Sequence, residues 1–146
     1  MAGRRQARRL AVDILYQADV TNADGRAVLA EWEHADRQIA PFTRELVEGV
    51  SEHLYELDRT IGSHAEGWRV ERMAALDRTI LRVACQELLY LSDVPVAVAI
   101  DEAVRAAKEL STEDSGRFVN GVLGRIAEGV ARPGPVDAGR DATEKS

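Results

Sequence analysis

The chain has 146 residues, enough for one domain with a substantial core, because chains of this length bury about 68–70% of their unfolded surface. Apolar residues make up 45% and aromatic residues only 5%, so the core of this globular protein is expected to consist mostly of Leu, Val, Ile and Ala. A single cysteine excludes an intrachain disulfide, no apolar stretch approaches the ~20 residues of a membrane span, and the formal net charge of −6 disfavours general coating of nucleic acid.

The first predicted helix, over residues 4–19, carries the most concentrated positive charge in the sequence. Many cations at the start of a helix oppose its macrodipole, which favours a functional explanation for them. Guanidinium groups bind phosphates bidentately and stack on bases, so we expect this segment to bind nucleic acid through a local positive patch. A solvated helix end is the alternative. No acidic residue precedes Asp13, and the arginines concerned are Arg4, Arg5, Arg8 and Arg9.

Two further helices are predicted before the middle of the chain. TNADG ends the first helix, a short helix follows over residues 26–36, and Pro41 begins a helix that continues to about His64. A solvated face is the ordinary interpretation of an acidic stripe on this last helix, and a docking surface for a basic partner is the alternative. The stripe consists of Glu45, Glu48, Glu52 and Glu56.

A central helix is predicted over residues 76–91, after a turn and a short helical piece. Its sequence, LDRTILRVACQELLYL, is apolar on nearly every side, which is typical of a helix in the middle of a bundle. Cys85 lies within this run, and we expect a small buried hydrophobe there and not a catalytic thiol. Arg78 and Arg82 stand four residues apart on the same helix, so each is expected either to reach the edge of the bundle or to pair with an acidic residue.

Two helices complete the predicted fold. In SDVP, Asp93 is expected to cap a helix that has Pro95 in its first turn and continues to Leu110. The last helix, over residues 111–130, keeps a helical period through Asn120-Gly121, a dipeptide that alone would suggest a hairpin.

The predicted elements form a single bundle. Six or seven helices and no strands indicate an all-α domain over residues 1–132. Residues 133–146 are polar and contain proline and glycine, with too little apolar surface to offset the entropy of ordering, so a disordered tail is expected. One free cysteine, and an N-terminus without the apolar core of a signal peptide, favour a cytoplasmic protein.

Nothing in the sequence indicates an active site. The three histidines, His34, His53 and His64, lack metal-ligand spacing, and there is no cysteine cluster. Neither a phosphate-binding GxxxxGK[ST] loop nor a G-x-S-x-G elbow is present. We therefore expect a protein that is not an enzyme and that uses no metal ion or cofactor.

Four segments carry a family resemblance over most of residues 4–131. They are RRQARRLAVDILYQ, FTRELVEGVSEHLYELDRTI, LDRTILRVACQELLYLSDVPVAVAIDEAVRAAKEL and EDSGRFVNGVLGRI. In these segments the chain resembles the NusB family of bacterial transcription antitermination factors. The resemblance implies a compact helical fold of two subdomains, of about three and four helices, that binds the boxA element of ribosomal RNA leader transcripts. It also implies a partner, the ribosomal small-subunit protein NusE, and a place in an RNA polymerase complex that resists termination.

The resemblance also implies two sets of site residues. At Asp114, acceptance of a hydrogen bond from a base amino group and capping of the last helix are both open. At Phe118, a core position and stacking on an unpaired base are both open. The implied RNA-binding positions are Arg4, Arg5, Arg8, Arg9, Arg82, Asp114 and Phe118. The implied positions facing the ribosomal protein are Tyr16, Val20, Glu71 and Asp77.

Some questions stay open at the level of sequence. Many relatives have an aromatic residue where this chain has Gln86. Family members differ in whether they self-associate, so a monomer and a homodimer are both open.

One competing function is that of the RNA-binding domain of a ribosomal RNA cytosine methyltransferase, which would need a catalytic domain with a glycine-rich cofactor loop and a nucleophilic Cys. The other is a helical scaffold that binds only proteins through its acidic faces.

Overall fold

The computed structural model describes residues 3–35 and 38–130. These residues form seven α-helices and one short 3₁₀ helix, and no strand occurs among them, which confirms the predicted all-α class. The tail predicted over residues 133–146 lies outside the described residues. In chain order the elements are α1 (Arg4–Val20), α2 (Gly25–His34), α3 (Pro41–Glu52), α4 (Leu54–His64), η1 (Val70–Arg72), α5 (Ala75–Tyr90), α6 (Val96–Leu110) and α7 (Glu113–Glu128).

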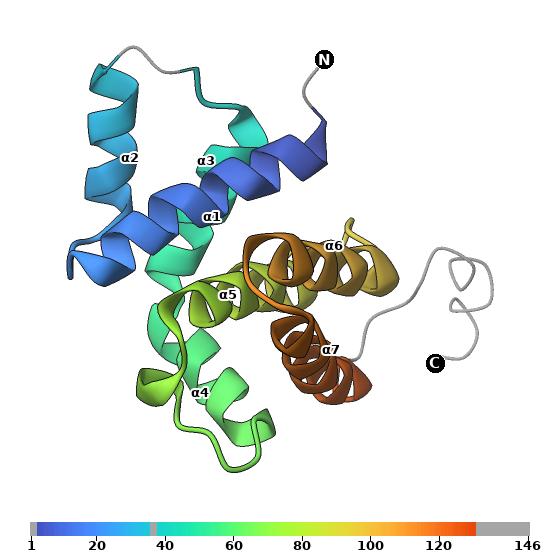
Figure 1. Ribbon diagram of the computed structural model, residues 1–146. Coiled ribbons are helices and arrows are strands. Elements are labelled where there is room, and N and C mark those ends of the chain that lie inside the picture. The colour runs from blue at the N-terminus through green and yellow to red at the C-terminus, as the bar shows by residue number, and fades with distance from the viewer. Residues whose placement is uncertain (1–2, 36–37, 131–146) are drawn as a thin grey trace.

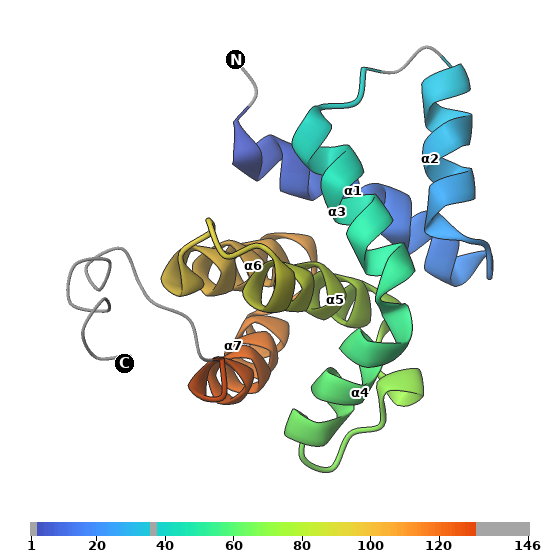
Figure 2. The same ribbon diagram turned by 180° about the vertical axis from the view of Figure 1, so that it is seen from behind.

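The helices form two groups that meet along α1, α3 and α5 (Figures 1 and 2). In the first group α1, α2 and α3 pack on one another. In the second group α5 contacts α4, α6 and α7, and α6 and α7 lie side by side. This arrangement agrees with the expected division into three and four helices, and it places α5 in the centre of the molecule.

One predicted helix, over residues 41–64, is wrong, because the structure divides it into α3 and α4. The break is at His53, where φ is −105° and ψ is 20°. The His53 ring stacks on Tyr90 with 3.8 Å between ring centroids, and its Nδ1 lies 3.1 Å from the Gln86 side-chain oxygen. Leu57, beyond the break, is still buried, so the apolar stripe continues across it and the sequence pattern gives no sign of the interruption.

The start of α6 also differs from the prediction. Pro95 occupies the N-cap position, and no side chain caps the helix. The Asp93 carboxylate instead accepts a hydrogen bond from Arg4 Nη2 at 3.3 Å. The start of α7 is capped by Thr112, whose side chain accepts from a backbone N–H of the first turn at 3.0 Å. Of the two roles left open for Asp114, capping is therefore wrong.

The centre of α5 is buried on nearly every side, as its sequence predicts. Cys85 is fully buried, and this burial raises the pKa of its thiol to about 12, so the prediction of a small core residue is confirmed. Gln86 is also buried and packs against α3 at Gly49, where an added Cβ would lie 2.2 Å from the Gln86 amide nitrogen. The absence of a side chain at Gly49 provides the space that Gln86 fills in this chain.

Candidate nucleic-acid interface

Each arginine in the first two turns of α1 forms an ion pair with an acidic side chain from a distant part of the chain. The acidic residues belong to α5, α6 and the turn between them, 79 to 100 residues further along the sequence. This charge is unopposed in the sequence but balanced in space, which offsets its unfavourable interaction with the helix macrodipole. The pairs are Arg4–Asp93, Arg5–Glu102, Arg8–Glu87 and Arg9–Glu109.

Arg8 lies inside the molecule. Its side chain is 10% exposed and that of Glu87 is 1% exposed. Arg8 Nε and Nη2 donate to the two Glu87 oxygens at 2.9 and 2.8 Å, which ties α1 to α5. Burial raises the pKa of the Glu87 carboxyl, and the hydrogen bonds from Arg8 oppose that rise. The Arg8 guanidinium therefore stabilises the packing of α1 against α5 and is largely inaccessible from solvent.

The other three arginines form a row along α6 that is open to solvent, which we name the arginine ridge: Arg4, Arg5 and Arg9. Arg5 is 57% exposed, and its Nε and Nη2 donate to the Glu102 carboxylate at 3.0 and 2.9 Å. These hydrogen bonds raise the pKa of Arg5 and lower that of Glu102. Arg4 lies over the Phe42 ring, with its guanidinium carbon 4.2 Å from the centroid. Ion pairs and ring packing thus orient guanidinium groups that remain accessible from solvent.

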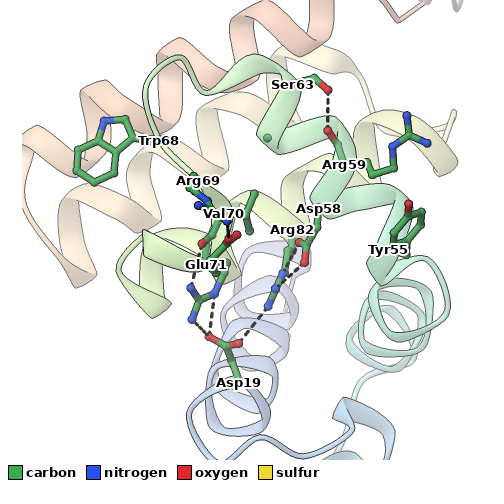
Figure 3. A pocket seen from close by; sticks show the side chains of 12 residues that line it. Asp19, Tyr55, Asp58, Arg59, Ser63, Trp68, Arg69, Val70, Glu71 and Arg82 are labelled. Carbon is green, nitrogen blue, oxygen red and sulfur yellow. Dashed lines mark hydrogen bonds and ion pairs between the residues drawn. The ribbon is translucent and has the colours of Figure 1, made fainter.

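Arg82 is held in a network that joins α1, α4 and α5 (Figure 3). Its Nε and Nη2 donate to the Asp58 carboxylate at 2.8 and 2.9 Å, and its Nη1 donates to Asp19 at 3.3 Å. Arg78 donates to the same Asp19 carboxylate at 2.6 Å and to the Val70 carbonyl at 3.0 Å. The predicted alternative of pairing with acidic residues is therefore confirmed for both arginines, and Arg82 does not join the arginine ridge.

A hollow of about 390 Å³ lies between the start of α7, the start of α5 and the loop after α4; we name it the aromatic hollow. Phe118 is half-buried there and meets Trp68 edge to face, with 6.0 Å between ring centroids and 66° between ring planes. Asp114 also lines it, is exposed, and forms an ion pair with Arg117. The structure thus brings together two residues that the sequence assigned to RNA binding, Asp114 and Phe118.

Two further residues of the aromatic hollow change the sequence-based description. Asp77, assigned by resemblance to the partner face, lies here, and its Oδ2 accepts from Ser115 Oγ at 3.2 Å. The other Asp77 oxygen, Oδ1, is buried and has no hydrogen-bond partner among the described residues. Trp68 is 53% exposed and was not predicted. The available signal was a tryptophan in the short turn GWR, directly after Gly67, whose φ is 78°.

The remaining partner-face positions lie elsewhere. Tyr16 and Val20 are exposed apolar residues on α1. Glu71, in η1, is exposed, pairs with Arg69 at 2.6 Å, and lines a hollow of about 730 Å³ beside Asp19 (Figure 3). Asp77 lines the aromatic hollow and not this one, although Trp68 lines both.

The structure also describes the acidic stripe and shows whether metal-ligand clusters or membrane-spanning helices occur in the described residues. All four glutamates of the acidic stripe are exposed, as expected for a solvated face. Among residues 3–35 and 38–130, no three His, Cys, Asp or Glu side chains gather closely enough to hold a metal ion. No helix in that part of the chain has both the length and the apolar character that crossing a membrane requires.

Comparisons with known proteins give a consistent result. The NusB family model matches residues 5–128 of this chain. The transcription antitermination protein NusB of Beutenbergia cavernae is 47% identical over 137 residues, which cover 86% of this chain and 90% of that protein. The solved structure of T. maritima NusB has a TM-score of 0.80 at 35% identity and covers 90% of this chain and 94% of its own. A crystal structure of the antitermination factors NusB and NusE in complex with dsRNA has a TM-score of 0.76 at 26% identity, with 86% of this chain and 96% of the other covered.

Proposed function

The chain belongs to the NusB family, and from this premise we propose that it is a transcription antitermination factor. In this proposal it binds the boxA element of ribosomal RNA leader transcripts together with the ribosomal protein NusE. The complex then joins RNA polymerase and makes it resistant to termination. The proposed role is one of binding and not of catalysis.

The observation that carries the RNA-binding part is the arginine ridge. A carboxylate engages two of the five N–H donors of a guanidinium group, as Glu102 does with Arg5, so the others are available to a phosphate. Arg8 contributes to RNA binding indirectly in this proposal, because it fixes the helix that carries the ridge.

The aromatic hollow supports contact with an unpaired base. Single-stranded RNA is commonly bound by stacking of bases on aromatic rings, together with hydrogen bonds to base edges. Phe118 and Trp68 offer the rings, and the exposed Asp114 carboxylate offers an acceptor for a base amino group. A carboxylate at this position disfavours phosphate, which directs the base and not the backbone toward it.

The proposed partner face consists of Tyr16, Val20 and Glu71. Exposed apolar side chains on α1 and an exposed carboxylate in η1 suit a partner that presents apolar and basic residues. The similarity to a NusB structure solved with NusE supports NusE as that partner. Asp77 is the weakest member of the predicted set, since one of its carboxylate oxygens is buried.

Titration of fluorescent single-stranded boxA RNA, with and without NusE, tests the RNA-binding proposal. Arg5→Ala and Arg9→Ala should each weaken binding and lower the slope of log K against log salt concentration by about 0.7 for each phosphate that the variant no longer neutralises. Arg26→Ala is the matched control, because Arg26 is 53% exposed and pairs with Asp24 at 3.2 Å on α2. Unchanged slopes in the two ridge variants, or an equal reduction in Arg26→Ala, would overturn the proposal.

Co-purification with NusE tests the partner face. Glu71→Lys reverses the charge of an exposed side chain and should reduce recovery of NusE at least tenfold, whereas the fold, followed by circular dichroism, should not change. Glu45→Lys makes the same charge change on the acidic stripe and should leave recovery unchanged. If only Glu45→Lys abolishes recovery, the acidic stripe is the partner face and the assignment of Glu71 is wrong.

A further inference from the structure

A groove of about 540 Å³ separates the exposed sides of α6 and α7. It is lined by Arg105 and Lys108 from α6 and by Arg117 and Asn120 from α7, all four of them exposed. Neither the sequence motifs nor the resemblance assigned any of these residues to a site. Three cations and one amide donor therefore converge on a surface to which no role has been given.

Two of these cations differ from the arginines of α1. Each α1 arginine pairs with a carboxylate, whereas Arg105 and Lys108 form no ion pair with any of the described residues. A phosphate that approaches Arg105 or Lys108 does not have to displace a bonded carboxylate. Cations in this state contribute more to phosphate binding than cations that are already paired.

The local packing also positions Lys108. Its side chain crosses the first turn of α7 at Gly116, where an added Cβ would lie 2.6 Å from Lys108 Cγ. The lack of a side chain at Gly116 lets the aliphatic stem lie against α7 while the ammonium group stays at the groove. This is the usual arrangement of a lysine that buries its methylenes and keeps its charge in water.

The groove connects the two surfaces already described. Glu109, the ion-pair partner of Arg9 on the arginine ridge, lines one end of it. Arg117 lines it on the α7 side and directly precedes Phe118, which lines the aromatic hollow. Figures 1 and 2 show α6 between α1 and α7, and α6 is joined to α1 by the ion pairs of Arg5 and Arg9 and packs against α7.

Acidic side chains are present as well, and they limit what the groove can bind. Glu109 is engaged with Arg9, and Asp101 stands exposed one turn before Arg105. The groove is therefore only weakly positive overall, which suits a few defined phosphate contacts and not a polyanion of arbitrary shape.

We propose that the α6–α7 groove binds the sugar-phosphate backbone of a single RNA strand and carries it from the arginine ridge to the aromatic hollow, with Arg105 and Lys108 as phosphate ligands. This inference rests on the proposed RNA-binding function and adds a second phosphate site to it. Asn120 supplies a neutral donor beside the same path.

The test compares two double variants that remove the same charge. Arg105→Ala with Lys108→Ala should lower the salt slope of single-stranded boxA RNA binding by about 1.4, for two phosphates, and weaken binding roughly tenfold. Arg59→Ala with Arg72→Ala is the control, because both residues are exposed and form no ion pair within residues 3–35 and 38–130, but lie on α4 and η1. It should change the slope by less than half as much. Arg105→Lys, which keeps the charge, should retain most of the affinity.

The outcomes separate this inference from the function on which it rests. If the unaltered protein does not bind the RNA, the proposed function fails. If Arg5→Ala lowers the salt slope but the Arg105 and Lys108 double variant does not, the function stands and the groove proposal is wrong. If the double variant binds RNA normally but no longer binds NusE, the groove binds protein and the proposal is again wrong. Both replaced side chains are exposed, so unfolding is not expected, and circular dichroism checks this.

Discussion

Two ion pairs on α1 use the same chemistry at different depths. Arg8 contacts Glu87 at 2.8–3.0 Å, and Arg5 contacts Glu102 at 2.9–3.3 Å, both through Nε and Nη2. The Arg8 side chain is 10% exposed, whereas that of Arg5 is 57% exposed. Because residue type and hydrogen-bond geometry are the same in both pairs, the extent of burial determines whether an arginine of this helix joins two helices inside the fold or remains accessible from solvent.

Physical reasoning predicts opposite consequences of removing the two arginines. Loss of one member of a buried pair leaves the other charge without compensation in a region from which water is excluded. Loss of Arg5, the exposed member of its pair, lets water and salt replace it beside Glu102, whose side chain is 15% exposed, so stability changes less than at Glu87. Stability measurements on variants of both pairs therefore test whether burial determines the role of each arginine.

The largest effect is expected for Arg8→Ala, because it removes the hydrogen bonds that Arg8 donates to the Glu87 carboxylate, which is 1% exposed. The free energy of unfolding, measured by urea denaturation, should fall by about 3–5 kcal/mol. The double variant Arg8→Met with Glu87→Leu replaces both charges by apolar groups and should recover most of that stability. A loss of stability in Arg8→Ala no greater than in Arg5→Ala, measured in parallel, would mean that depth does not distinguish the two pairs.

An intermediate effect is expected for Asp19→Asn, which weakens the network around Arg78 and Arg82. Hydrogen bonds to charged groups contribute about 1.5–3 kcal/mol, and the loss of stability should lie in this range because Arg82 keeps its bonds to Asp58. Urea denaturation measures it. Asp101→Asn, at an exposed carboxylate, is the control and should change stability by less than about 0.5 kcal/mol. Equal changes in the two variants would show that the network does not stabilise the fold.

The sequence contained more information about Arg8 than its position in a basic run suggested. Ala11, Val12 and Leu15 follow Arg8 by three, four and seven residues and are all buried, so Arg8 lies on the apolar face of α1. Arg9 lies off that face and Arg5 lies at its border, and their side chains are 30% and 57% exposed. Helical periodicity, applied to the charged residues as well as to the apolar ones, predicts the burial of Arg8, but it places Arg4 on the same face, and the Arg4 side chain at the first residue of α1 is 50% exposed.

Two other features, the ion pairs of the arginine ridge and the break between α3 and α4, could not be predicted from the pattern of neighbouring residues. The acidic partners of the arginine ridge lie 89 to 100 residues away, and only the packing of the helices brings them near. At the helix break, the His53 ring stacks on Tyr90 from another helix. The helical period predicted most element boundaries well because burial of one face is a local property, whereas these contacts depend on the tertiary fold.

The smallest effect on stability is expected for Glu102→Gln, which removes the acidic partner of Arg5. Hydrogen bonding with Arg5 lowers the pKa of the Glu102 carboxyl below its ordinary value of 4.5, so the folded protein binds this proton less tightly than the unfolded chain. The charged carboxylate therefore stabilises the fold above about pH 4.5, and its contribution disappears as the pH falls through the lowered pKa.

Unfolding measurements from about pH 7 to about pH 3 should show this dependence. Glu102→Gln should be slightly less stable than the unaltered protein at neutral pH, by less than Asp19→Asn, and the two curves should converge at the acidic end. Glu45→Gln, at an exposed glutamate, should follow the unaltered protein throughout. RNA binding by Glu102→Gln should strengthen by roughly threefold, since phosphate no longer competes with a carboxylate for Arg5. A stability difference that stays constant with pH, or weaker RNA binding, would mean that Glu102 acts through its shape and not its charge, and that exposed and buried arginines differ by more than depth.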